Sequence, residues 1–94
     1  MTNRLRQIHA IAKGRVQKVG YRNFCVEQAT GLGITGYAQN LSNGDVKIVA
    51  EGDESILREY IKLLRKGPIL ALVKEVEFRW EEPENKFKGF EIKI

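Results

Sequence analysis

The chain has 94 residues, 43% of them hydrophobic, and 16 Lys and Arg against 12 Asp and Glu give it a net charge of +4. This length and composition predict one folded domain over residues 1–94, exclude a disordered segment, and suit a small anionic ligand or weak nucleic-acid binding. A lone Cys25 and a lone His9 exclude an internal disulfide and a clustered zinc site, and no apolar run is long enough to span a membrane.

The first half of the chain predicts three strands and one helix. Alternating side chains predict a strand over residues 5–13, and apolar spacing predicts a helix over residues 22–32 that ends at glycines. Residues 33–41 and 45–51 predict two strands, and Asn43-Gly44 between them predicts a type I′ hairpin with two positive φ angles. The side chains expected on one face of these elements are Ile8, Ala10, Ala12, Phe24, Cys25, Ala29, Leu32, Val46, Ile48 and Ala50.

The second half predicts a helix and one or two strands. Asp53 can cap a helix that ends at Gly67-Pro68, and residues 73–80 alternate as a strand. A polar loop over residues 81–88 precedes residues 90–94, which form either a short extra strand or a β-extension. The expected apolar side chains of this helix and strand are Ile56, Leu57, Tyr60, Ile61, Leu63, Leu64, Val76, Phe78 and Trp80.

The element order is therefore β-α-β-β-α-β. This order is typical of the ferredoxin-like fold, an α+β or α/β sandwich. We expect an antiparallel sheet with two helices on one face and a partly solvated opposite face.

The segment from Gly14 to Phe24 carries the strongest functional signal. Glycines at 14 and 20 flank a short loop, and Arg22 falls where the helix should begin. Loop amides, a helix N-terminus and a guanidinium together suit a phosphate or carboxylate ligand. An ordinary strand-to-helix turn with an exposed arginine would use the same residue types, so the residues alone leave both interpretations open.

Two blocks resemble the acylphosphatase family. The run Gly14-Arg15-Val16-Gln17-Lys18-Val19-Gly20-Tyr21-Arg22 resembles the family's phosphate-binding signature G-R-V-Q-G-V-G-[YF]-R. The block from Gly36 to Val46 resembles G-[WY]-V-x-N-x-x-[DN]-G-x-V, with Ala38 in place of the commoner valine. The resemblance covers nearly the whole chain and implies the ferredoxin-like fold and metal-independent hydrolysis of acyl phosphates.

The resemblance also implies site residues. Arg22 aligns with the catalytic arginine, and Asn40 aligns with the catalytic asparagine that orients the attacking water. An amide has no usable pKa, so Asn40 cannot be a general base, and the residues alone also allow it to cap the hairpin. No metal ligand or cofactor is implied. The phosphate-binding cradle implied by the family consists of the amides of Gln17, Lys18, Val19, Gly20 and Tyr21, completed by Arg22.

Lys18 departs from the family signature, which usually has glycine there. If that position needs a positive φ, a lysine is strained by roughly 1–2 kcal/mol. If the backbone is ordinary, Lys18 adds a flexible positive charge near the ligand. Because the rest of the motif is intact, we favour the ordinary backbone. Elsewhere, we expect a sheet-face His9 and a buried, structural Cys25.

Two other functions share this fold class. RNA-recognition modules stack bases on sheet aromatics, but Lys88-Gly89-Phe90 does not continue their motif. A noncatalytic phosphate-binding module within a larger enzyme is the other alternative, and the length of this chain favours a stand-alone hydrolase. We expect a cytoplasmic monomer that acts on a small-molecule acyl phosphate, binds inorganic phosphate or sulfate as product or analogue, and has no nucleic-acid or membrane partner.

Overall fold

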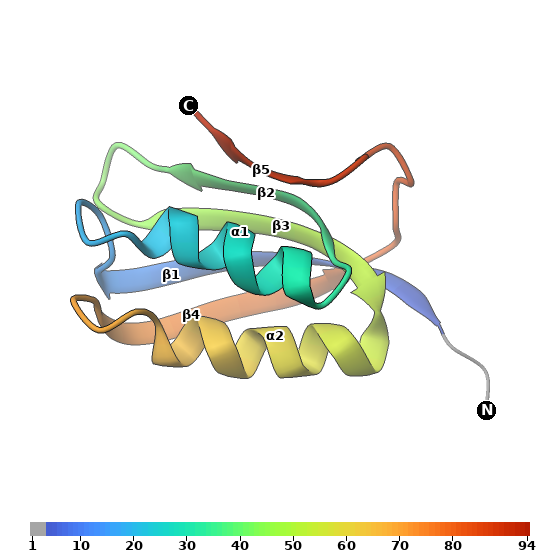
Figure 1. Cartoon of the computed structure of the whole chain (residues 1–94), viewed down its shortest axis with the longest axis horizontal. Coiled ribbons are helices and arrows are strands. Elements are labelled where there is room, and N and C mark those ends of the chain that lie inside the picture. Colours follow the sequence, from blue (N-terminus) through green and yellow to red (C-terminus); the bar gives the residue numbers. More distant parts are fainter. Residues whose placement is uncertain (1–3) are drawn as a thin grey trace.

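The computed structural model describes residues 4–94 and contains every element that the sequence predicts, with ends that differ by at most two residues (Figure 1). Strand β1 extends through Gly14 and Arg15, so the loop that follows it is shorter than the sequence indicates. The elements in chain order are β1 (Leu5–Arg15), α1 (Tyr21–Gly31), β2 (Thr35–Asn40), β3 (Val46–Asp53), α2 (Glu54–Lys66), β4 (Leu72–Glu81) and β5 (Phe90–Lys93).

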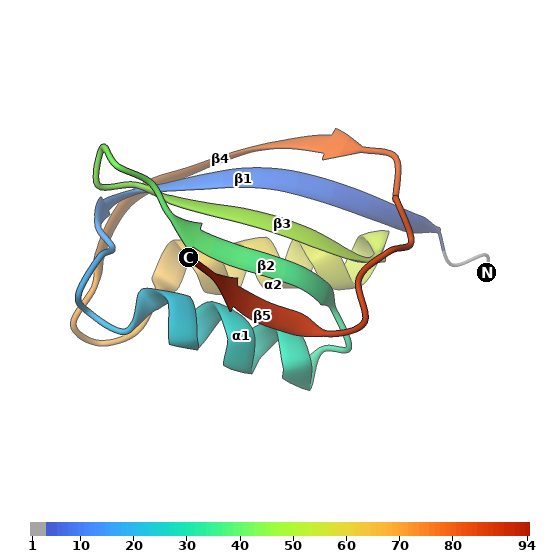
Figure 2. The same ribbon diagram turned by 90° about the horizontal axis from the view of Figure 1, so that it is seen from above.

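The strands form one sheet in the order β4-β1-β3-β2-β5. Strand β1 pairs antiparallel with β3 and β4, and β2 pairs antiparallel with β3, as expected for this fold. Strand β5 pairs parallel with β2, so the sheet is mixed and the expectation of an antiparallel sheet is wrong at this edge. The reason is visible in Figure 2: the segment after β4 crosses the end of the sheet and delivers β5 to the opposite edge.

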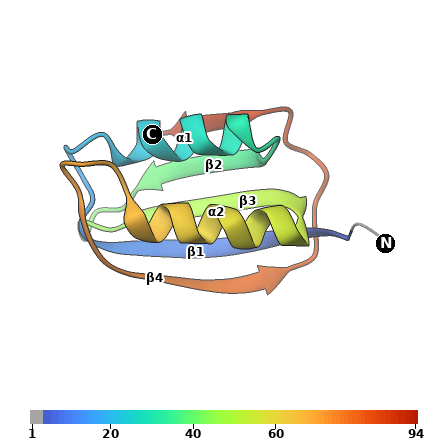
Figure 3. The same ribbon diagram turned by 60° about the horizontal axis from the view of Figure 1, so that its bottom comes forward.

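Both helices cover the same face of the sheet, as predicted (Figures 2 and 3). The alanines at 10 and 12 of the inner strand β1 are fully packed and let the helices approach it closely. Phe78 and Trp80 are partly buried against this core, which confirms their packing role. The larger core side chains are Ile8, Tyr21, Cys25, Ile48, Leu57, Tyr60, Ile61 and Leu64.

Two buried tyrosines tie the helices together in a reciprocal way. The Tyr21 hydroxyl of α1 donates to the Leu64 carbonyl of α2 (2.8 Å), and the Tyr60 hydroxyl of α2 donates to the Cys25 carbonyl of α1 (2.9 Å). Burial raises the pKa of both phenols, so both stay protonated donors. Cys25 is free and fully buried, as predicted, and burial raises the pKa of its thiol to about 12.

Two local predictions are wrong in detail. Asp53 occupies the N-cap of α2, but its side chain makes no capping hydrogen bond. In the hairpin, Gly44 has a positive φ (98°) and Asn43 does not, so the turn is not type I′. The Asn43 Oδ1 accepts the Asp45 amide (3.0 Å), and the Leu41 amide donates to the Asp45 carbonyl (2.9 Å). This is a three-residue loop in which one glycine supplies the left-handed residue.

Candidate anion-binding site

A cavity of about 140 Å³ opens at the end of the sheet where β1 passes into α1. The loop after β1, the first turn of α1, the end of β2 and the edge strand β5 supply its walls. It therefore joins segments from both ends of the chain around the predicted anion loop. Its lining residues are Val16, Lys18, Gly20, Tyr21, Arg22, Asn23, Asn40 and Ile92.

The N-terminus of α1 lines this cavity and has no side-chain cap. Gly20 is the N-cap with φ 78° and ψ 15°, a left-handed conformation that glycine adopts without strain. It offers no capping side chain, and the first turn has no acidic residue. The first amides of a helix have no partner inside it, so those of residues 21–23 remain available as donors. Free amides and the helix dipole both favour an anion here.

Arg22 adds a full positive charge to the same cavity. Its side chain is half-buried, and within residues 4–94 it takes part in no ion pair. The same holds for Arg15 at the end of β1 and for Lys18 on the loop. The ion pairs of the described chain lie elsewhere, as between Arg6 and Glu54 (2.9 Å). The guanidinium is therefore not neutralised by a carboxylate and can bind oxygens of a phosphoryl group in its planar fork.

Asn40 lines the same cavity as Arg22. It is the last residue of β2, paired with Val46 of β3. Its Oδ1 is buried and has no hydrogen-bond partner within residues 4–94, whereas the hairpin beside it is closed by the side chain of Asn43. The hairpin-capping alternative for Asn40 is therefore wrong. A buried acceptor that lines a cavity is suited to holding a water molecule there.

The predicted cradle residues divide into two groups. Lys18, Gly20, Tyr21 and Arg22 line the cavity, as the family signature implies. Gln17 and Val19 are not among its lining residues. The Val19 side chain packs in the core, and the Gln17 side chain donates from Nε2 to the carbonyls of Leu41 (2.8 Å) and Asp45 (2.9 Å).

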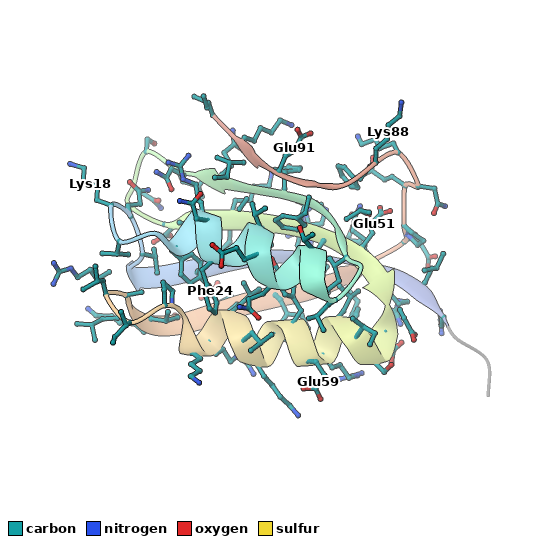
Figure 4. The ribbon with its side chains drawn as sticks, viewed as in Figure 1. Lys18, Phe24, Glu51, Glu59, Lys88 and Glu91 are labelled. Atoms are coloured by element: carbon teal, nitrogen blue, oxygen red, sulfur yellow. The ribbon has the colours of Figure 1, made fainter. Side chains whose placement is uncertain are left out.

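The expectation of an ordinary backbone at Lys18 is wrong. Its φ is 64°, in the left-handed region that the family's usual glycine adopts freely. The loop turns from strand to helix through left-handed residues at both 18 and 20, which leaves a lysine strained by roughly 1–2 kcal/mol. The exposed side chain extends from the tip of the loop, away from the body of the molecule (Figure 4).

Sequence reasoning missed three lining residues. Asn23 could have been found, because a helix leaves its first three amides free and this one begins at Tyr21. Val16 is a core side chain that also lines the cavity. Ile92 reaches the cavity only because β5 pairs with β2, which places it beside Ala38. No local sequence pattern predicts that pairing.

His9 lies apart from the cavity, on the sheet face that the helices leave open. Its Nε2 hydrogen-bonds with Gln7 Oε1 (2.7 Å), and its Nδ1 lies 3.3 Å from Arg79 Nη2. Partial burial, and then the charge of Arg79, lower the pKa of His9. The predicted sheet-face histidine is confirmed. Within residues 4–94, no three His, Cys, Asp or Glu side chains gather into a metal-binding group, and no helix could cross a membrane.

Comparison with known proteins decides the family. The acylphosphatase family model matches residues 8–92, which include both walls of the cavity. The chain belongs to the acylphosphatase family. It is 51% identical over 87 residues to an acylphosphatase of Dehalococcoides mccartyi, covering 92% of this chain and 96% of that protein.

Two further acylphosphatases are similar to this chain. An acylphosphatase of Thermus thermophilus is 48% identical over 83 residues, covering 88% of this chain and 93% of that protein. The crystal structure of acylphosphatase from Bacillus subtilis superposes with a TM-score of 0.91 at 28% identity, covering 97% of this chain and all (100%) of that one. The ferredoxin-like α+β fold is thus shared with family members of known structure.

Proposed function

We propose that this chain hydrolyses the carboxyl–phosphate bond of acyl phosphates, releasing a carboxylate and inorganic phosphate. The main-chain amides of residues 17–21, the further free amides at the start of α1 and the guanidinium of Arg22 bind the phosphoryl oxygens. Phosphoryl transfer passes through a loose transition state with charge spread over those oxygens, so fixed donors supply much of the catalysis. The leaving carboxylate is weakly basic, which removes the need for a strong general acid.

The observation that carries this proposal is the buried, unpartnered Oδ1 of Asn40 in the same cavity as Arg22. An amide oxygen accepts a hydrogen from water and so can aim the water's lone pair at phosphorus. The water attacks phosphorus as the bond to the acyl oxygen breaks, and the phosphate itself accepts the water's proton. Asn40 takes no proton at any stage.

Sequence identity also supports a hydrolase over a noncatalytic module. The chain is 51% and 48% identical to the Dehalococcoides and Thermus acylphosphatases. A noncatalytic phosphate-binding module would bind phosphate at the cavity without turning over an acyl phosphate. Turnover is therefore the property that separates the two.

The test is hydrolysis of benzoyl phosphate with excess chelator present. We expect turnover that chelator leaves unchanged, that inorganic phosphate inhibits competitively, and that Arg22→Ala and Asn40→Ala each reduce by at least about two decades. Binding of phosphate without hydrolysis would support the noncatalytic module instead. Loss of turnover on chelation would contradict the metal-independent mechanism.

We further propose that the enzyme works as a cytoplasmic monomer on small-molecule acyl phosphates. The buried, unpaired Cys25 is compatible with a reducing compartment. The 140 Å³ cavity is suited to the phosphate of a small molecule. Its lining shows no feature that calls for a stacked nucleic-acid base. Light scattering at assay concentrations should give the mass of one chain, 10.7 kDa. A stable dimer would contradict this.

A further inference from the structure

The side chain of Gln17 connects the anion loop to the hairpin that follows Asn40. Both hydrogens of its Nε2 are used: one goes to the Leu41 carbonyl at 2.8 Å and the other to the Asp45 carbonyl at 2.9 Å. These acceptors lie 24 and 28 residues further along the chain, on the two sides of the hairpin loop. One half-buried amide thus spans the gap between the two walls of the cavity.

Leu41 and Asp45 are the residues that close the hairpin. The Leu41 amide donates to the Asp45 carbonyl (2.9 Å), so Gln17 binds a pair that is already joined. Leu41 directly follows Asn40. A displacement of this pair relative to the anion loop would therefore move the Asn40 backbone relative to Arg22.

No hydrogen bond within residues 4–94 holds the Asn40 Oδ1 itself. Its direction depends on the backbone of β2 and on packing. The backbone at the end of β2 is anchored to the anion loop by Gln17, which lies next to the left-handed Lys18. The position of Asn40 Oδ1 and the shape of the anion loop are thus coupled through the side chain of Gln17.

We propose that Gln17 is a positioning residue whose side chain holds Asn40 in register with the phosphate-binding loop. This inference rests on the proposed function. It assigns to Gln17 a part in orienting the attacking water, separate from the amide donor role that the family signature implies for its main chain. The side chain touches neither the substrate nor the water.

Gln17→Met is the variant that tests this role, since methionine keeps the length and volume but donates no hydrogen bond. We expect the kcat for benzoyl phosphate to fall between about ten- and a hundredfold, as misplaced reacting groups typically cause. Inhibition by inorganic phosphate should change by less than about twofold, because Arg22 and the helix amides remain. Gln17→Glu, of the same shape but with oxygen facing two carbonyl oxygens, should lower kcat at least as much.

Gln39→Met is the matched control. Its Nε2 also donates to a backbone carbonyl, that of Ile94 (3.3 Å), but on the exposed side of β2 and away from the anion loop. We expect its kcat to stay within about twofold of the unmodified enzyme. Urea unfolding of each variant sets conditions under which all are fully folded.

A double-mutant cycle separates positioning from a general loss of structure. In the Asn40→Ala background, Gln17→Met should lower kcat by less than about twofold, because both changes remove the same water orientation. A normal kcat in Gln17→Met, an undiminished fall in the Asn40→Ala background, or a weakened phosphate affinity in place of a lower kcat would each overturn the inference. If the unmodified enzyme hydrolyses benzoyl phosphate and Asn40→Ala does not, those outcomes leave the proposed function intact.

Discussion

The cavity at the start of α1 and the carboxylate of Glu51 lie at opposite ends of the sheet (Figure 4). The buried side-chain oxygens of Glu51 have hydrogen-bond partners, whereas the buried side-chain oxygen at the cavity has none in the described chain. Glu51 is only 7% exposed, yet its oxygens accept hydrogen bonds from Gln7 Nε2 (2.6 Å) and from the amides of Glu84 (2.6 Å) and Asn85 (3.1 Å). These bonds hold the segment that carries the chain to β5. At the cavity, Asn40 Oδ1 is also buried but has no partner in the described chain.

This difference indicates which buried polar groups in a small fold are candidates for a function. Burying a polar group without a partner costs free energy, so proteins usually saturate such groups, as around Glu51. One other buried side-chain atom of residues 4–94 lacks a partner, Arg6 Nε, but that guanidinium is held by Glu54 and by the Trp80 ring at 4.8 Å. Asn40 lies beside free amides and a free guanidinium, a combination that a bound phosphate and water would satisfy.

Removing Arg22 should produce the largest effect on activity. Arg22→Ala deletes a fixed charged donor, worth about 2.7–4 kcal/mol in the transition state, so kcat/KM should fall by two to three decades. The free energy of unfolding should change by less than about 1 kcal/mol, since Arg22 makes no ion pair in the described chain. Steady-state kinetics and urea unfolding check both. An active Arg22→Ala enzyme would remove the guanidinium from the account.

Asn40→Ala should lower activity by a comparable amount but leave phosphate binding in place. The alanine removes the acceptor that orients water, while Arg22 and the helix amides still bind the anion. Because the deleted oxygen has no partner within residues 4–94, the protein should be as stable as before or slightly more stable. Inhibition by phosphate can be measured on residual turnover or by calorimetry. A loss of phosphate affinity equal to the loss of rate would contradict this division of roles.

Glu51→Gln should reverse the pattern, with stability lost and activity kept. An amide at this position turns one acceptor into a donor that faces other donors, at a cost of about 1–3 kcal/mol. The urea midpoint should fall, and the kcat of the folded enzyme should stay within about twofold. If Glu51→Gln lowers kcat as strongly as Asn40→Ala does, the two clusters are not separate.

Lys18→Gly should stabilise the protein modestly. Glycine relieves a strain of roughly 1–2 kcal/mol at φ 64° but gains freedom in the unfolded chain, so a net gain below about 1 kcal/mol is expected. Asn85→Gly, at the other positive-φ residue that is not glycine (56°), is the control and should gain less, since asparagine tolerates this conformation. Phosphate affinity should change by less than about fivefold, as for an exposed charge. A larger loss would give Lys18 a direct part in binding.

The smallest expected effect is the pH dependence contributed by His9. Its pKa is lowered in the folded protein, first by burial and then by Arg79, so the unfolded chain binds its proton more readily. His9 therefore destabilises the fold as the pH drops below its ordinary value of 6.5. The urea midpoint should fall less between pH 8 and pH 5.5 in His9→Gln than in the unmodified protein. Equal falls would show that His9 contributes nothing.

The sequence predicts most of this molecule because its signals are local. Alternation in β1 and the apolar stripe of α2 give the elements, and the order of elements gives the fold. The loop between α1 and β2 also behaves as its glycines indicate, with Ile34 donating to the Ala29 carbonyl (2.8 Å) in a helix-ending turn.

What sequence reasoning missed depends on contacts between distant segments or on one backbone angle. Each residue of β5 pairs with a residue of β2 that lies 54 positions earlier, as Ile92 does with Ala38. Neither that parallel edge nor Ile92 in the cavity therefore follows from a local pattern. The turn around Lys18 sets its backbone φ to a positive value, although a lysine side chain disfavours a positive φ. The role of Gln17 required the position of the hairpin 24 residues away.

The most direct test of the account is a crystal structure with phosphate bound. We expect the anion in the cavity, within hydrogen-bond distance of main-chain amides of residues 17–23 and of the Arg22 guanidinium, with a water between Asn40 Oδ1 and phosphorus. An empty cavity, or Arg22 and Asn40 directed away from a common centre, would contradict the central claim that loop, helix and amide converge on one phosphoryl group.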